Sequence, residues 1–399
     1  MHVKGGFNIY YAFAYILFLA SLGQIAADLY VPSLNSITND LKSNINTIQL
    51  SVPCYVYGYG AMQIVYGPLS DAYGRKKPLM VGLIIMLFGT YMCFIANQDY
   101  ELLLGRALQG LGAASCNAIY KAALRDLFPS KVLTKVSSYF AIITTIAIAI
   151  APFLGGIIDT EFGWRWNFGA IFILNVILLI MVFLTKETNR YKDSKQVSYA
   201  SLKENILLIF RNRNFVVATT AILLSYGGLL CWLSVSPFLL INIFQFNSIQ
   251  CGFINLMVGF AFAVGGAMNS LIATKENSNI IIKFGFGIML FAGLFLFMTG
   301  FYNVSPLVVI SAVICFSFGT SFVAPNAMAI CLEPFKRIAG LAGAVLGLIK
   351  NVGAALICNI LAFAPDTNQM PLSIAYICIS IVGLTMVFRY LTTDNKAKA

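Results

Sequence analysis

Long apolar segments recur along the chain from one end to the other, and short polar segments separate them. Each apolar segment is about 20 residues long, which is enough for an α-helix to cross the ~30 Å hydrocarbon core of a bilayer. The pattern predicts twelve transmembrane helices, at residues 9–31, 48–68, 78–96, 101–123, 136–158, 168–185, 215–240, 250–272, 284–301, 305–330, 338–361 and 371–391. The chain is therefore predicted to be an all-α membrane protein.

The longest polar segment lies between the sixth and seventh predicted helices. It divides the chain into an N-terminal six-helix bundle at residues 1–186, a cytoplasmic linker at residues 187–213 and a C-terminal six-helix bundle at residues 214–399. Two halves with equal numbers of helices are typical of duplicated transporters. Within the linker, Tyr199–Phe210 is predicted to form a short surface helix.

The distribution of Lys and Arg predicts the orientation of the chain. Of the 26 such residues, only Lys42 and Arg165 lie in loops opposite the N-terminus, while Arg106 and Lys350 lie within predicted helices. Because basic loops stay on the cytoplasmic side, both termini are predicted to be cytoplasmic in a multi-pass membrane protein. The first apolar segment is longer than the core of a signal peptide, so we interpret it as the first transmembrane helix.

Composition argues against several other classes of protein. Hydrophobic residues make up 59% of the 399 residues and charged residues 10%, whereas soluble domains have about 25% charged residues. The net charge of +11 does not indicate nucleic-acid binding, because the basic residues lie between apolar segments. The nine cysteines include no CxxC pair, so neither a zinc site nor a disulfide is expected. With one histidine, His2, and no phosphate-binding loop, neither an enzyme nor a cofactor is expected.

Three charged residues lie well inside predicted helices: Asp28, Arg106 and Lys350. A charge at this depth costs at least about 2.5–3.5 kcal/mol on insertion scales, so each is a functional candidate. Asp28 and Arg106 lie at similar depth and can pair; Asp28 is the candidate proton carrier, and a static ion pair is the alternative. Lys350 lies near the middle of the eleventh helix, where it either faces a cavity, extends to the surface or bonds to backbone carbonyls.

The sequence GPLSDAYGRKKP at residues 67–78 forms a turn after the second helix. It closely resembles the G-x-L-[AS]-D-x-x-G-R-[RK] signature of the major facilitator superfamily, although Ala72 stands where a basic residue often follows the aspartate. The resemblance implies that superfamily's fold, with twelve helices in two six-helix bundles. We predict that the turn is a conformational latch in which Asp71 faces the start of the eleventh helix, near Ala339 and Gly340. The latch residues are Gly67, Asp71, Gly74, Arg75 and Asp126, the last of which Arg75 is expected to reach.

Two further segments resemble motifs of the same superfamily. LLLGRALQGLGAA at residues 102–114 resembles R-x-x-Q-G-x-G-A-A, which implies that Arg106 lines the cavity and takes part in coupling, while its small residues are interpreted as helix-packing residues. AIAIAPFLGGII at residues 147–158 resembles the drug-antiporter motif G-x-x-x-G-P-x-x-G-G. Its positions are Ala147, Ala151, Pro152, Gly155 and Gly156. The two alanines replace glycines, which weakens the implication of antiport but not that of the fold.

The segments AADLYVPSL, ALRDLFP and FGWRWNF, at residues 26–34, 123–129 and 162–168, narrow the resemblance to the bicyclomycin-resistance (Bcr/CflA) branch of drug:proton antiporters. The resemblance covers essentially the whole chain. It implies a proton-coupled exporter of small, fairly apolar compounds, with multidrug or bicyclomycin-type efflux and antibiotic resistance as its role. A proton-coupled importer or metabolite permease on the same fold is the alternative, and a non-transporting membrane receptor is a third class.

A cavity between the two halves is expected to hold the small-molecule substrate and to open alternately to each side of the membrane. The candidate lining residues are Tyr30, Gln109, Asn117, Tyr226, Trp232, Asn326 and Lys350, for each of which packing within the bundle is the alternative role. Lys350 stands where the family more usually has glutamine, and we predict that it favours substrates with a negative or polar group. Protons and the lipid bilayer are the other expected partners, and the protein is expected to be a monomer.

Overall fold

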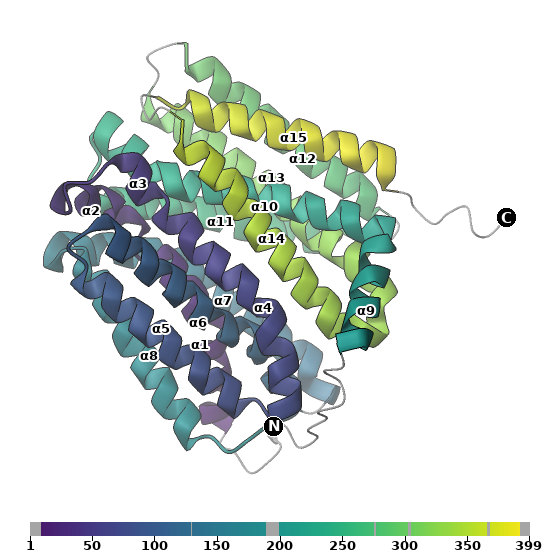
Figure 1. The fold of residues 1–399 in the computed structure, drawn as a ribbon. Coiled ribbons are helices and arrows are strands. Elements are labelled where there is room, and N and C mark those ends of the chain that lie inside the picture. The colour runs from purple at the N-terminus through teal and green to yellow at the C-terminus, as the bar shows by residue number, and fades with distance from the viewer. Residues whose placement is uncertain are drawn as a thin grey trace. The chain divides into compact units, whose positions relative to one another are not determined.

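Helices account for nearly all of the chain that the computed structural model describes. The described residues are 9–128, 130–188, 199–274, 277–301, 305–364 and 368–391. The chain divides into two compact units, Met1–Lys203 and Glu204–Ala399, and Figure 1 shows that each unit is a bundle of long helices.

The long helices agree with the predicted number of transmembrane segments. The first unit contains α1 (Ile9–Asp28), η1 (Val31–Ser33), α2 (Leu34–Asp40), α3 (Ile45–Gln49), α4 (Ser51–Tyr73), α5 (Lys76–Ile95), α6 (Asp99–Leu127), α7 (Ser130–Phe162) and α8 (Arg165–Leu184). The second contains α10 (Arg213–Pro237), η3 (Phe238–Ile243), α11 (Ser248–Ile272), α12 (Ser278–Thr299), α13 (Pro306–Leu332), η4 (Glu333–Ile338), α14 (Ala339–Ala362) and α15 (Met370–Tyr390). The described residues thus form twelve helices of 20 residues or more, which confirms the predicted twelve-helix fold. The short helix expected in the linker is α9 (Tyr199–Arg211).

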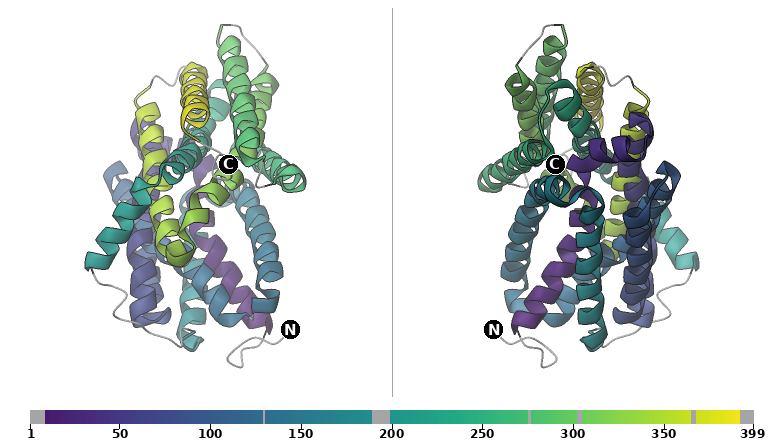
Figure 2. Two further views of the ribbon diagram at one scale, coloured as in Figure 1. Left: turned by 90° about the vertical axis from the view of Figure 1, so that its right-hand side faces the viewer. Right: turned by 90° about the vertical axis from the view of Figure 1, so that its left-hand side faces the viewer.

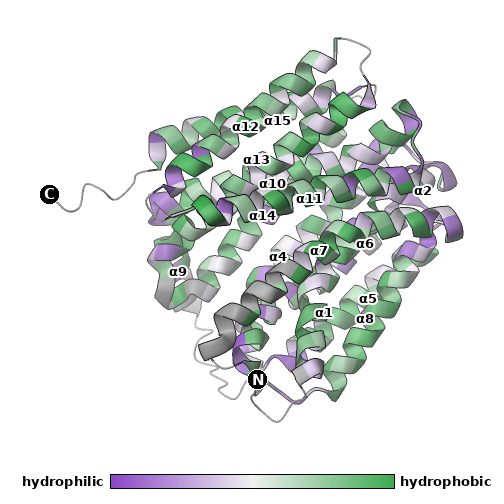
Figure 3. Cartoon of the chain, turned by 180° about the vertical axis from the view of Figure 1, so that it is seen from behind, coloured by the Kyte–Doolittle hydropathy of each residue, from purple (hydrophilic) through white to green (hydrophobic). Residues whose placement is uncertain are grey.

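Ten of the described helices are long and apolar enough to cross a membrane. The two exceptions, α4 and α6, pack against each other within the first unit. Helix α6 is less apolar because it contains Arg106 and Gln109, both completely buried. A helix whose polar side chains are covered by neighbouring helices can cross a membrane with less apolar sequence than a helix that faces lipid. Figure 3 shows apolar residues along the long helices and polar residues gathered at α2 and the connecting turns.

The two units repeat the same set of helix neighbours. In the first unit, α6 packs against α1, α4 and α5, and α8 packs against α1 and α5. In the second, α13 packs against α10, α11 and α12, and α15 packs against α10 and α12. The first helix of each unit also packs against the fifth, as α1 with α7 and α10 with α14. The duplication that is weak in the sequence is therefore clear in the packing, and Figure 2 allows each bundle to be followed from both sides.

Small residues permit the closest helix contacts of the first unit. A Cβ at Gly110 would lie 2.0 Å from the carbonyl oxygen of Tyr55, and a Cβ at Gly112 would lie 2.3 Å from that of Gly82. Neither position can carry a side chain without separating α6 from α4 or α5. The small residues of the α6 motif therefore serve packing, as the sequence predicted. No disulfide joins the nine cysteines, all of which lie in described segments.

Candidate functional site

The helical span that starts at α1 is interrupted near Asp28. Helix α1 ends at Asp28, three residues before the predicted boundary, and the chain continues through the short helix η1 into α2. Pro32 lies at the start of η1. Because proline has no N–H and its ring clashes with the carbonyl four residues earlier, an α-helix cannot continue past Asp28 without distortion. The last carbonyls of α1 are thus left without partners in their own helix.

Arg106 supplies partners for those carbonyls. Its side chain is completely buried, and its guanidinium donates to the carbonyl oxygens of Ala26 at 2.9 Å and Ala27 at 3.5 Å. A positive charge at a helix C-terminus is favoured by the helix dipole. Arg106 therefore caps the interrupted end of α1 from α6.

The surroundings of Arg106 hold its guanidinium in place. Gln109 accepts a hydrogen bond from it, and the carbonyl of Ser51 accepts another at 3.4 Å. The rings of Tyr30 and Tyr55 lie 4.1 Å and 4.3 Å from the guanidinium carbon, within the range of cation–π attraction. With four hydrogen bonds and two aromatic rings around it, the guanidinium of Arg106 has little freedom to move toward Asp28.

Asp28 is the last residue of α1 and is partly exposed. It lies near enough to Arg106 for the two charges to interact, but no ion pair joins them in the described part of the chain. A carboxylate at a helix C-terminus is disfavoured by the dipole, whereas the protonated form is not. The structure thus places the acidic group of Asp28 beside a capped helix end, and its role in proton transfer stays a prediction.

The antiporter-like motif of α7 packs against the same interruption. A Cβ at Gly155 would lie 1.6 Å from the carbonyl oxygen of Leu29, just after Asp28, so only glycine fits at this position. Asn167 donates to the hydroxyl of Ser33 at 2.7 Å and to the carbonyl of Gly155 at 3.2 Å. The motif therefore makes room for the non-helical backbone between α1 and η1.

The residues at the other four motif positions fit the packing around α7. Ala151, Pro152 and Gly156 are buried, and Ala147 is half-buried. Pro152 lies inside the helix, where it removes one backbone hydrogen bond. The methyl of Ala151, which is only 2% exposed, is accommodated by the packing.

Four of the predicted cavity residues are packed inside their own units. Tyr30 and Gln109 are completely buried, Tyr30 bonded to Ser51 at 2.8 Å and Gln109 donating to Thr90 at 2.9 Å. In the second unit, two side chains form buried polar pairs between helices. These are Trp232, which donates to Asn255 at 2.8 Å, and Asn326, which donates to Asn269 at 2.8 Å. The packing alternative therefore describes these four residues in this structure.

Asn117, Tyr226 and Lys350 remain as partly exposed candidates. The Lys350 ammonium on α14 lies 4.3 Å from the ring centroid of Tyr226 on α10. A cation over a tyrosine face is attracted by the ring quadrupole. Lys350 therefore contacts another helix of its unit, although its contribution to substrate binding stays a prediction.

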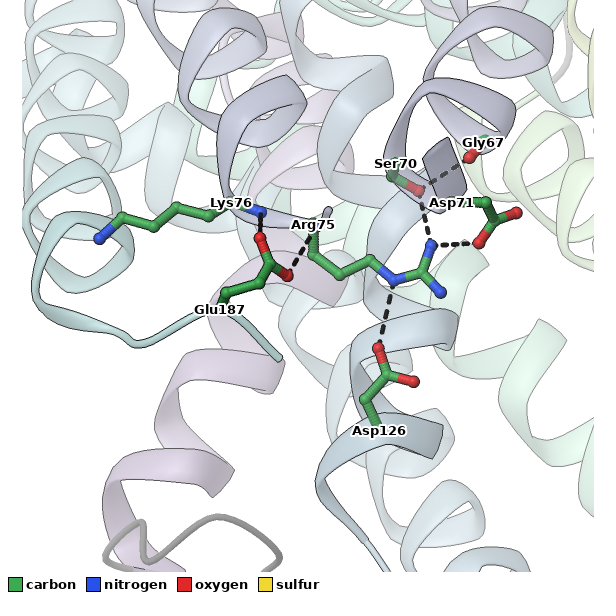
Figure 4. Close-up of polar contacts among 7 residues, drawn as sticks. All are labelled: Gly67, Ser70, Asp71, Arg75, Lys76, Asp126 and Glu187. Atoms are coloured by element: carbon green, nitrogen blue, oxygen red, sulfur yellow. Dashed lines mark hydrogen bonds and ion pairs between the residues drawn. The ribbon is translucent and has the colours of Figure 1, made fainter. Parts of the chain in front are cut away.

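The predicted latch residues of the first unit form a network on Arg75 (Figure 4). Gly74, with φ of 96°, turns the chain between α4 and α5 in a conformation that favours glycine. The guanidinium of Arg75 donates to the carboxylate of Asp71, to the hydroxyl of Ser70 at 2.8 Å and to the carboxylate of Asp126 at 3.2 Å. The expected contact between Arg75 and Asp126 is present.

Gly67 and the contact of Asp71 with the other unit are the remaining parts of the predicted latch. Among the described residues of its unit, no atom lies within 4 Å of a Cβ built at Gly67, so packing against them does not require glycine there. The carbonyl of Gly67 accepts a hydrogen bond from Ser70 at 2.8 Å. The expected approach of Asp71 to the start of α14 concerns the other unit and stays a prediction.

Glu187 was not among the residues predicted from the sequence. It lies three residues after the end of α8, and its carboxylate accepts hydrogen bonds from the backbone N–H groups of Arg75 and Lys76 at the start of α5. The only local signal was an acidic residue shortly after a long apolar segment. Nothing near Glu187 in the sequence indicates that its partners lie more than 100 residues earlier.

Comparison with known proteins identifies the family of the chain. The family model of the major facilitator superfamily matches residues 16–358. The chain belongs to the major facilitator superfamily. It is accordingly a multi-pass transporter of the bacterial inner membrane.

Relatives and solved structures agree with this assignment. The chain is 26% identical over 388 residues to the bicyclomycin resistance protein homolog of Haemophilus influenzae, covering 96% of this chain and 97% of that protein. It is 24% identical over 383 residues to multidrug resistance protein D of Escherichia coli K12, covering 94% of each. A crystal structure of a D-xylose–proton symporter superimposes with a TM-score of 0.78 at 13% identity, covering 96% of this chain and 98% of that one. At that identity the structural likeness concerns the fold alone.

Proposed function

We propose that this member of the major facilitator superfamily exports small, fairly apolar compounds in exchange for protons. The single observation that carries the proton coupling is the position of Asp28, an acid at the interrupted end of α1, near the buried Arg106. Relatives named for resistance to bicyclomycin and to multiple drugs support efflux as the direction. One proton entering down about 100 mV supplies about 2.3 kcal/mol, which sustains a roughly fifty-fold concentration gradient.

Protonation of Asp28 is the step that we assign to coupling. When the carboxylate takes up a proton, the negative charge at the C-terminal end of α1 disappears, and with it the unfavourable interaction with the helix dipole. Arg106 then interacts with the carbonyls of Ala26 and Ala27 without competition from a neighbouring carboxylate. Protonation thereby changes the electrostatic interactions of Asp28 with the helix dipole and with Arg106. These interactions act at the C-terminal end of α1, where the helix has the fewest backbone hydrogen bonds of its own.

Alternating access by movement of the two halves is the proposed mechanism, with both termini cytoplasmic. The Asp71–Arg75–Asp126 network is the first half's part of the latch, and we propose that Asp71 binds the N-terminal end of α14 when the cytoplasmic sides of the halves are close. A carboxylate at a helix N-terminus contributes about 0.3–1 kcal/mol, and up to about 2 kcal/mol when partly buried. The latch would thereby stabilise the outward-open state.

An importer or metabolite permease is the second candidate function. The observation that favours it is Ala147 and Ala151 at the two leading positions of the antiporter-like motif, where the motif has glycine. Export is preferred because Pro152 and Gly155 are retained and Gly155 packs closely on α1.

The experiment uses inverted membrane vesicles that carry the protein, an imposed proton gradient and a lipophilic fluorescent dye. Export predicts dye accumulation in the vesicles that an uncoupler abolishes, together with dye-induced proton release. Asp28→Asn is expected to abolish both while dye binding survives, because the neutral amide resembles the protonated acid. Glu161→Gln, at an exposed acid of the same unit, is the matched control. Normal dye-induced proton release by Asp28→Asn would refute the coupling role.

A further inference from the structure

The N-terminus of α5 is capped by a residue from a distant part of the chain. The two carboxylate oxygens of Glu187 accept hydrogen bonds from the backbone N–H groups of Arg75 at 2.8 Å and Lys76 at 3.2 Å (Figure 4). The first N–H groups of a helix have no partner within the helix, and Arg75, the N-cap residue of α5, supplies no side-chain cap. Glu187 therefore provides the cap, from 112 residues away in the sequence.

Lys76 makes the reciprocal contact with α8. Its ammonium donates to the carbonyl oxygen of Phe183 at 2.6 Å and lies 5.4 Å from the centroid of the Phe183 ring. Phe183 belongs to the last turn of α8, where carbonyls lack helical partners and a positive charge is favoured. The start of α5 and the end of α8 thus cap each other. The acidic Glu187 binds the N-terminus of α5, and the basic Lys76 binds the C-terminus of α8.

Arg75 is the residue on which the cap and the latch network meet. Its backbone is held by Glu187, while its side chain binds the carboxylates of Asp71 and Asp126. The preceding Gly74, at φ of 96°, permits backbone rotation that other residues resist. Without the hydrogen bond to its N–H group, the backbone of Arg75 would be free to rotate together with Gly74. The guanidinium would then no longer be held in a fixed position relative to Asp71 and Asp126.

We propose that Glu187 is a positioning residue of the latch, which holds the backbone of Arg75 so that the guanidinium bridges Asp71 and Asp126. This inference rests on the latch in the proposed function. The cap is made wholly within the first unit, so it persists while contacts with the other half form and break. Because Glu187 lies three residues after the end of α8, it also connects the first position of the predicted linker to Arg75.

The test measures how often the cytoplasmic side opens. A reporter introduced by Asn117→Cys, with Cys54, Cys315 and Cys378 replaced by serine, is labelled in inverted vesicles with a membrane-impermeant maleimide. Glu187→Ala is expected to raise the labelling rate by up to about five-fold, the ratio for losing a latch contact of about 1 kcal/mol with a helix dipole. Glu187→Gln retains one acceptor oxygen and should give a smaller increase. Glu161→Ala, an exposed acid of the same unit, should change nothing.

Combining variants separates positioning from general stabilisation. If Glu187 acts through Arg75 on the latch, the pair Glu187→Ala and Asp71→Asn should label no faster than Asp71→Asn alone. Additive effects of the two changes would overturn the proposal. If Asp71→Asn raises labelling but neither Glu187 variant does, the positioning role is wrong and the latch stands. If Asp71→Asn has no effect, the latch itself fails. Where Glu187→Ala does not give a folded, monodisperse protein, Glu187→Gln alone decides.

Discussion

Replacing Gly155 with alanine tests the packing of α7 on the interruption of α1. The added Cβ would stand 1.6 Å from the carbonyl oxygen of Leu29 and 2.7 Å from its carbonyl carbon. Both are backbone atoms, so the overlap cannot be relieved by rotating a side chain. Either α7 moves away or the backbone that follows Asp28 shifts. Overpacking of this kind typically costs about 1–3 kcal/mol, and here the shift also disturbs the hydrogen bonds of Asn167.

The assays for Gly155→Ala are thermal stability of the solubilised protein, followed by size-exclusion chromatography, and dye efflux in vesicles. Both are expected to fall. Gly287→Ala on α12 is the matched control, because no atom of the described residues lies within 4 Å of the Cβ built there, and alanine at an open helical position is tolerated or slightly stabilising. Equal stability and equal efflux for the two variants would show that α7 does not constrain the end of α1.

The remaining predictions concern the latch, the cavity and the packing of the second unit. Asp71→Asn should shift the protein toward the inward-open state by about 1 kcal/mol, the scale of a contact with a helix dipole; cysteine labelling on both sides measures this, and an unchanged pattern counts against the latch. Lys350→Gln should reduce export of anionic compounds more than that of cationic ones; an equal change for both classes rules out a role in selectivity. Trp232→Phe leaves the side-chain amide oxygen of Asn255 without the indole N–H that donates to it at 2.8 Å. The free energy of unfolding should fall by about 1–3 kcal/mol, as measured by thermal unfolding; unchanged stability would show that this pair is dispensable.

The sequence predicted the motifs of the site better than its contacts, because a motif is contiguous in the sequence whereas a contact joins residues that are far apart in it. The segments around Asp71, Arg75 and Arg106 are contiguous in the sequence, so they could be recognised as motifs. The partners of Arg106 are backbone carbonyls on α1, which have no signature of their own. For the same reason, the sequence suggested an ion pair with Asp28 and not a helix cap.

Several predicted cavity residues are buried and paired within their own units. Trp232 and Asn326 are polar groups in apolar helices, and this pattern suits a ligand contact and a buried helix–helix pair equally well. Their partners, Asn255 and Asn269, lie on a neighbouring helix. A buried polar group needs a hydrogen-bond partner, but only the packed bundle shows which residue provides it.

The sequence alone indicated the number of transmembrane helices, their approximate positions and the positions of the motifs, although α6 and α7 are longer than predicted. These properties are local, because a segment's hydropathy and turn chemistry depend on neighbouring residues. The tertiary structure shows which helix ends are capped and which residues cap them. Arg106 caps α1 from α6, and Glu187 caps α5 from the end of α8. Such contacts join residues that are far apart in the chain, and their existence depends on distances of a few ångströms that only packing sets.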